Sequence, residues 1–140
     1  MSDYPDVLTL LPHRPPALYV DRMVSWDGMR LVAERHFVPE DVPGHFPDRP
    51  VVPGVVMVEA LAQSLACLAS LMGERGNPYL TGIEKAKFRG VVVPPATLRM
   101  EVEVTDRRMG VTWAKGKVLR DGVMVCQANL QAVLIAEGAG

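Results

Sequence analysis

The chain has 140 residues, and its 15 lysine and arginine side chains against 16 aspartate and glutamate side chains give a net charge of −1. This length fits a single domain over residues 1–140, and the charge gives no basic excess for nucleic acid or an anionic membrane. Apolar residues make up 49% and charged residues 22%, which excludes a disordered chain. The two cysteines, Cys67 and Cys126, lack a metal-ligand spacing. We therefore expect buried thiols in a reducing cytoplasm, and no metal.

The first half of the chain is predicted to form two strands and then a turn-rich segment. Residues 18–26 and 29–38 are strand candidates, separated by Asp27-Gly28, a hairpin turn signal. Residues 39–53 contain five prolines, which exclude a helix or a central strand there.

An apolar segment, Gly54–Met72, is predicted to be the long helix, with Gly73 at the position of a helix stop. It is long enough to span a bilayer. However, Glu59 lies well inside it and the rest of the chain resembles strands, so a buried core helix of a soluble protein is favoured over a membrane span.

The second half is predicted to form about four antiparallel strands, over residues 79–89, 98–105, 111–120 and 123–135. Strict alternation in the first of them places one set of side chains on one face, namely Ile83, Lys85, Lys87 and Arg89, and the other set on the opposite face, namely Glu84, Ala86 and Phe88.

Such a sheet has one apolar face to cover, and the predicted helix is the only element available to cover it. A sheet wrapped around one central helix is the α+β hotdog fold. Because one helix covers the sheet incompletely and is apolar on all sides, we expect a dimer.

Several features that could carry chemistry converge at the start of the helix. His45 lies in a proline-rich loop that leads into it. The backbone N–H groups of Gly54 and Val55 are free at a helix start, and Gly54 has no side chain to block approach to them. Glu59 is the lone carboxyl on an otherwise apolar helix.

These groups suit the elimination of water from a 3-hydroxyacyl thioester. A neutral histidine can remove the proton α to the thioester carbonyl. The helix-start N–H groups can stabilise the negative charge that develops on the carbonyl oxygen. A carboxyl in apolar surroundings has a raised pKa and can protonate the leaving hydroxyl. No metal or redox cofactor is needed.

Three segments resemble the FabZ-type 3-hydroxyacyl-(acyl-carrier-protein) dehydratases of type II fatty-acid synthesis: LPHRPPALYVDR (Leu11–Arg22), GHFPDRPVVPGVVMVEALAQ (Gly44–Gln63) and TGIEKAKFRGVVVP (Thr81–Pro94). The likeness runs in order over residues 8–133. It implies a cytoplasmic hotdog homodimer, often assembled as a trimer of dimers, that acts on a thioester carried by the phosphopantetheine of an acyl carrier protein.

The resemblance also implies roles for single residues. His45 would be the base and Glu59 would act on the hydroxyl, the two coming from different protomers, while Gly54 would donate to the thioester carbonyl. The branch that also isomerises the double bond has aspartate at the carboxylate position, so Glu59 resembles the non-isomerising branch. The structural alternative is a buried Glu59 paired with an arginine across an interface.

Two further residues match family positions. Gln63 resembles the residue that supports the carboxylate, and a purely structural hydrogen bond is an equal interpretation. Tyr79 falls where the family has a tyrosine that gates the acyl tunnel, although a tyrosine at the start of a strand is commonly a packing residue.

The segment after the first strand of the second half departs from the family pattern. Gly90-Val91 replaces a basic-proline pair, and Pro95-Ala96 stands where glycine and aspartate are usual. These changes concern the shape of a loop rather than the catalytic pair. Before this loop, Lys85, Lys87 and Arg89 could form a docking patch for an acidic carrier protein, or only a solvated face.

The leading hypothesis is therefore a hydro-lyase that converts (3R)-3-hydroxyacyl thioesters to trans-2-enoyl thioesters in fatty-acid or polyketide-type synthesis. Two alternatives stay open. A hotdog thioesterase could use the same helix start to polarise a thioester for attack by water. A non-catalytic acyl-carrier-binding subunit could pair with a sister hotdog chain.

Overall fold

The computed structural model describes residues 4–42, 48–74 and 76–135. In these residues a single antiparallel sheet has the strand order β1-β2-β4-β5-β6-β3. The strands are β1 (Arg22–Asp27), β2 (Arg30–Phe37), β3 (Asn77–Phe88), β4 (Ala96–Arg108), β5 (Val111–Arg120) and β6 (Val123–Ile135). The helical elements are α1 (Val7–Leu10), the 3-10 turn η1 (Pro39–Asp41) and the long helix α2 (Gly54–Leu71).

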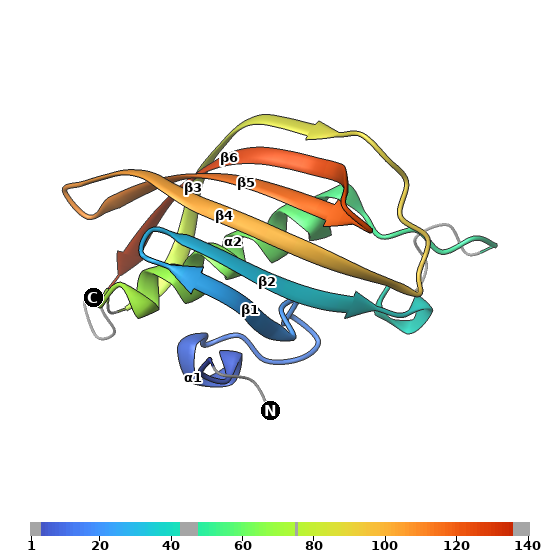
Figure 1. Cartoon of the computed structure of the whole chain (residues 1–140), viewed down its shortest axis with the longest axis horizontal. Helices are drawn as coiled ribbons and strands as arrows, with labels where there is room; N and C mark the ends of the chain where they lie inside the picture. The colour runs from blue at the N-terminus through green and yellow to red at the C-terminus, as the bar shows by residue number, and fades with distance from the viewer. Residues whose placement is uncertain (1–3, 43–47, 75, 136–140) are drawn as a thin grey trace.

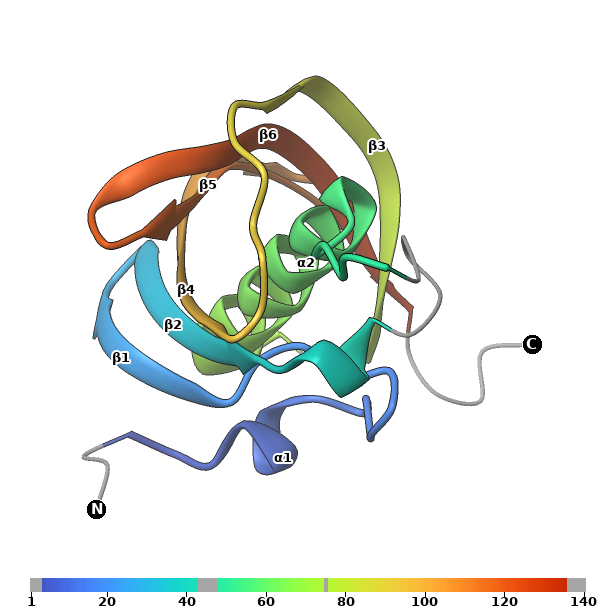
Figure 2. The same cartoon turned by 90° about the vertical axis from the view of Figure 1, so that its right-hand side faces the viewer.

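The sheet curves around α2, which runs through the middle of the molecule (Figures 1 and 2). In Figure 2, β1 and β2 lie on one side of the helix and β3 lies on the other. The predicted hotdog fold is thus confirmed. Although α2 has the length and hydropathy of a membrane span, most of it is buried inside this fold.

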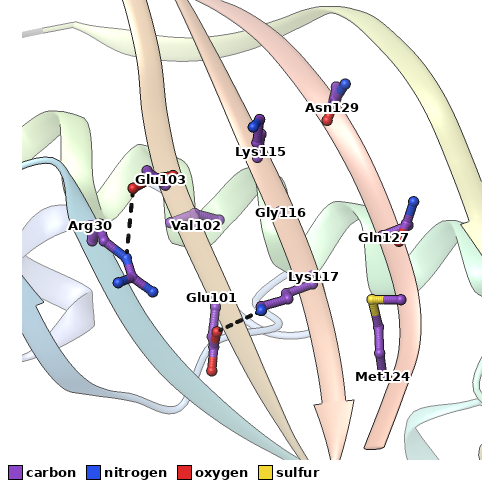
Figure 3. Close-up of a pocket in the computed structure, with 10 residues that line it drawn as sticks. All are labelled: Arg30, Glu101, Val102, Glu103, Lys115, Gly116, Lys117, Met124, Gln127 and Asn129. Atoms are coloured by element: carbon purple, nitrogen blue, oxygen red, sulfur yellow. Dashed lines mark ion pairs between the residues drawn. The ribbon is translucent and has the colours of Figure 1, made fainter.

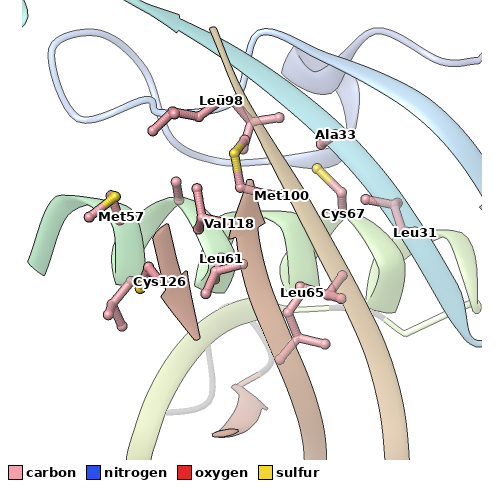
Figure 4. Close-up of a cluster of buried hydrophobic side chains, with 14 of the residues drawn as sticks. Leu31, Ala33, Met57, Leu61, Leu65, Cys67, Leu98, Met100, Val118 and Cys126 are labelled. Atoms are coloured by element: carbon pink, nitrogen blue, oxygen red, sulfur yellow. The ribbon is translucent and has the colours of Figure 1, made fainter. Parts of the chain in front are cut away.

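The core forms between α2 and the concave face of the sheet (Figure 4). In β4 alternate side chains point inward and are buried, namely Leu98, Met100, Val102 and Val104. They meet Leu61, Leu65 and Leu68 of α2. Both thiols, Cys67 and Cys126, are also buried in this core, as predicted.

The N-terminal segment differs from the prediction. Strand β1 begins only at Arg22, not at residue 18. The physical reason is a side chain of α2: the N–H of Tyr19 donates to Gln63 Oε1 at 2.7 Å, so this part of the backbone is bonded to the helix. Upstream, Asp6 caps the short helix α1, which the sequence did not lead us to expect.

The predicted alternation along β3 is wrong because this strand contains two irregularities, between Leu80 and Gly82 and between Glu84 and Lys87. In the second, Lys85 has a φ of 53°, and one extra residue shifts the phase. Ile83 therefore pairs with Leu130 on the face toward α2, whereas Lys87 pairs with Gln127 on the outer face.

The same shift returns Phe88 to the inner face of β3, opposite Cys126. The two sets of side chains expected from strict alternation are therefore mixed. Glu84, which was expected to share a face with Phe88, pairs with Asn129 on the outer face.

Candidate active site

The first turn of α2 offers backbone N–H groups. Its N-cap is Pro53, whose carbonyl accepts from the N–H groups of Val56 at 3.0 Å and Met57 at 3.2 Å. Within the described parts of the chain, the N–H groups of Gly54 and Val55 have no hydrogen bond. They are the unsatisfied donors that a helix start provides, at its positive end.

Gly54 is in close contact with the end of β3. A Cβ atom at this position would lie 2.7 Å from Cδ1 and Cε1 of Phe88. The glycine is thus required by the aromatic ring beside it. Access to the N–H groups, the reason expected from the sequence, is therefore not the only reason for a glycine at this position.

Glu59 lies five residues further along α2, about 7.5 Å along the helix axis at 1.5 Å per residue. Its side chain is half-buried, and this burial raises the pKa of its carboxyl. No ion pair or hydrogen bond of Glu59 occurs among the residues that the structure describes, and its pairing with an arginine across an interface stays an alternative. This carboxyl is suited to hold a proton.

His45 belongs to residues 43–47, outside the described residues, and its role as the base stays a prediction. On the C-terminal side of these residues, the N–H of Val52 donates to the carbonyl of Val92 at 2.9 Å. Val92 is buried and belongs to the segment that departs from the family pattern. The unusual segment therefore packs beside the entry to α2.

On the N-terminal side, Arg35 forms a bridge that sequence reasoning missed. Its guanidinium contacts Asp21 Oδ1 at 2.8 Å and Asp41 Oδ1 at 3.0 Å. The second oxygen of each carboxylate accepts a backbone N–H, from His36 at 2.7 Å and Val38 at 2.8 Å respectively. The bridge holds η1 to β2, a few residues before His45. No local sequence pattern marks this arrangement.

Gln63 is almost completely buried, with 1% of its surface exposed. Its Nε2 donates to the carbonyl of Ala17 at 2.8 Å, and its Oε1 accepts from the N–H of Tyr19. The structural interpretation of Gln63 is thereby confirmed. Its expected support of the carboxylate stays a prediction.

The other predicted site residues lie along β3. Tyr79 is half-exposed at the start of the strand, whereas Phe88 and Gly54 meet at the strand's other end. A single chain therefore does not bring Tyr79 to the helix start. The predicted docking residues Lys85, Lys87 and Arg89 are exposed, and none has an ion pair among residues 4–42, 48–74 and 76–135.

A cavity of about 270 Å³ lies elsewhere, on the face of the sheet turned away from α2 (Figure 3). Charged side chains line it, including the pairs Lys117–Glu101 at 3.6 Å and Arg30–Glu103 at 3.9 Å. None of the predicted site residues borders it.

Comparison with known proteins points to one family. A sequence model of the FabA-like domain matches residues 11–129. Relatives named 3-hydroxyacyl-[acyl-carrier-protein] dehydratase FabZ include one from Anaeromyxobacter sp. (strain K), 44% identical over 94% of this chain and 90% of the relative. Another, from Roseiflexus sp. (strain RS-1), is 40% identical over 95% of this chain and 96% of the relative.

Solved structures show the same fold. The dehydratase heterocomplex ApeI:P from Xenorhabdus doucetiae contains a chain that matches with a TM-score of 0.82 and 12% identity, covering 96% of this chain and 93% of that one. The E. coli PaaI protein from the phenylacetic acid degradation operon matches with a TM-score of 0.67 and 12% identity, over 80% and 81%. On the sequence matches, this chain belongs to the FabA-like family, together with the FabZ dehydratases.

Proposed function

We propose that this protein eliminates water from (3R)-3-hydroxyacyl thioesters carried on acyl carrier protein, giving trans-2-enoyl thioesters. The observation that carries the proposal is the half-buried carboxyl of Glu59, which has no partner among the described residues and follows two free N–H groups on the same helix. The 44% identical FabZ relative supports the same reaction.

The chemistry follows from what each group can do. His45 removes a proton from the carbon next to the thioester carbonyl. The N–H groups of Gly54 and Val55 stabilise the negative charge that then develops on the carbonyl oxygen. The electron pair of the broken C–H bond forms the new double bond, and the C–O bond to the hydroxyl breaks. Glu59 gives its proton to the leaving hydroxyl, so that water departs.

The assembly that we propose is a homodimer formed through β3, which can serve as the basic unit of a trimer of dimers. Strand β3 is an edge of the sheet, and side chains on its inner face remain exposed, with Ile83 at 47% and Phe88 at 52%. An edge strand with exposed apolar side chains is a template for pairing with a second copy. Antiparallel pairing would carry Tyr79 of one copy toward the helix start of the other.

The acyl carrier protein is the proposed partner, and Lys85, Lys87 and Arg89 are its proposed docking residues. Their charges are not neutralised by ion pairs within the described part of the chain. An acidic partner would be attracted to such charges over a distance of about 8–10 Å at physiological salt. The departure at Pro95-Ala96 lies after this strand and leaves these side chains in place.

The test is turnover of 3-hydroxyacyl-acyl-carrier-protein by the wild type and by His45→Ala and Glu59→Gln. We expect enoyl thioester from the wild type and losses of at least about 100-fold in each variant, as for removal of a general acid or base. Full activity in either variant contradicts the assignment of that residue.

The same assay separates the two alternatives. Free thiol without enoyl product would favour a thioesterase. Carrier binding without any turnover would favour a non-catalytic subunit. Substrates of several chain lengths would show which acyl group is preferred.

A further inference from the structure

An aromatic ring occupies the place where a side chain would stand on the first residue of α2. A Cβ atom on Gly54 would lie 2.7 Å from Cδ1 and Cε1 of Phe88 and 3.2 Å from its Cγ. Rotating the ring about its own axis moves Cδ1 and Cε1 but leaves Cγ at 3.2 Å, which is still a tight contact. A methyl group on residue 54 would therefore require the Phe88 side chain to shift away from the helix start.

The strand is shaped to place the ring there. One extra residue between Glu84 and Lys87 shifts the phase of β3, and Lys85 adopts a φ of 53° at this point. This left-handed conformation is unfavourable for a lysine. If the side chains alternated strictly from Ile83 onward, Phe88 would lie on the outer face of the sheet. The irregularity therefore aims Phe88 at Gly54, as bulges near functional sites commonly do.

Phe88 does not serve as an ordinary core residue, since 52% of its surface is exposed. Val55, on the same turn of the helix, is also exposed. The ring thus forms an apolar wall beside the two free N–H groups.

We propose that Phe88 is a positioning residue for the dehydration. Its ring holds the first turn of α2 and closes one side of Gly54, so that a thioester carbonyl reaches the N–H groups of Gly54 and Val55 from the open side only. Water is excluded from the closed side, which strengthens these donors. This role rests on the proposed function.

The proposal makes Gly54 and Phe88 interdependent. If the ring is what demands a glycine, a methyl group at position 54 harms the enzyme by displacing Phe88. In Gly54→Ala we expect kcat to fall about 100-fold, as for a damaged oxyanion site, and in Phe88→Ala about tenfold. The double variant should recover about to the level of Phe88→Ala, because the added methyl then meets no ring. The losses should fall on kcat more than on KM, since the donors act on charge that develops in the transition state.

The matched control is Gly116→Ala, which introduces a methyl 3.1 Å from Leu61 in the middle of α2. It should lower stability without a selective loss of kcat, and Phe88→Ala should not correct it. Phe88→Leu keeps an apolar side chain and should retain more activity than Phe88→Ala.

Two outcomes would overturn the proposal. If the wild type is active and the loss of kcat in the double variant equals the product of the two single losses, Gly54 and Phe88 act independently. That result would overturn the role of Phe88 but leave the proposed dehydratase function standing. A wild type without turnover of the hydroxyacyl substrate would overturn the proposed function, and the role of Phe88 with it.

Discussion

The two long sides of α2 differ in how completely one chain covers them. Toward β1 and β2, the N-terminal segment is tied to the helix by Gln63, and Tyr19 stacks on Phe37 with ring centroids 6.2 Å apart. Toward β3, the apolar side chains of Ile83 and Phe88 stay exposed. The described chain thus covers the first side, whereas apolar side chains remain exposed on the second, where we propose that a second copy packs.

Glu59 lies at the border between these two sides. It is four residues from both Val55, which is exposed, and Gln63, which is buried, so it lies between them on the helix surface. The hydrogen bonds of Gln63 hold the N-terminal segment against the helix on the covered side, whereas the open side is where we propose that substrate and a second copy bind.

A substitution that disrupts the interface proposed on the open side should have the largest effect on activity. Ile83→Glu places a charge on the inner face of the edge strand, where the second copy is proposed to pack, and burying it unpaired is costly. We expect a monomer in sedimentation analysis and turnover reduced at least about 100-fold, because His45 and Glu59 would no longer meet across the interface. Trp26→Glu, on the opposite edge strand β1, is the control and should leave association unchanged. A fully active Ile83→Glu monomer would contradict the two-chain site.

On the covered side, Gln63→Leu should be the most damaging change. It removes two hydrogen bonds and leaves the N–H of Tyr19 and the carbonyl of Ala17 without their partner. We expect a loss of about 2–3 kcal/mol in the free energy of unfolding, measured by urea denaturation. Ser70→Ala, on the same helix, is the comparison and should cost little. A near-neutral Gln63→Leu would mean that the segment is held by its apolar contacts alone.

The features that local sequence determines were the easier ones to predict. Apolar patterning predicted α2, and the hairpin signal at Asp27-Gly28 predicted the turn between β1 and β2, where Gly28 has a φ of 58°. The lone Glu59 on this helix was visible for the same reason. These features depend on local sequence.

What the sequence could not predict depends on contacts between distant segments. The left-handed Lys85 has no local signal, because lysine is not a residue that favours this conformation. The contact of Phe88 with Gly54 follows from that irregularity, and the bridge made by Arg35 joins three separate segments. Each is settled only when the chain is folded.

The Arg35 bridge should contribute somewhat less than Gln63. Its side chain is 17% exposed, but Asp21 and Asp41 reach more solvent. Arg35→Met should therefore cost about 1–2 kcal/mol in thermal or urea unfolding. Arg30→Met breaks an exposed pair at 3.9 Å on the same strand and should cost at most about 0.5 kcal/mol. Equal losses in the two variants would show that the bridge adds nothing beyond an ordinary surface pair.

The smallest expected effect concerns the protonation of Glu59. Burial raises the pKa of this carboxyl above its ordinary value of 4.5, so the folded chain holds the proton more tightly than the unfolded chain. The stabilisation is fully present below pH 4.5 and is lost as the pH rises through the pKa of the folded state. Because the side chain is only half-buried, the effect should stay below about 1 kcal/mol.

The measurement is the free energy of unfolding of the wild type and of Glu59→Gln from pH 4 to pH 8. The difference between the two proteins isolates the contribution of the Glu59 carboxyl from that of all other carboxyls. The wild type should lose stability relative to the variant as the pH rises. The same pair of measurements in the Ile83→Glu background sharpens the comparison of the two sides. If a second copy covers the open side, it removes further water from Glu59, and the pH dependence should be larger in the dimer than in the monomer. Identical pH dependence in both backgrounds would place Glu59 on the side that the chain covers by itself.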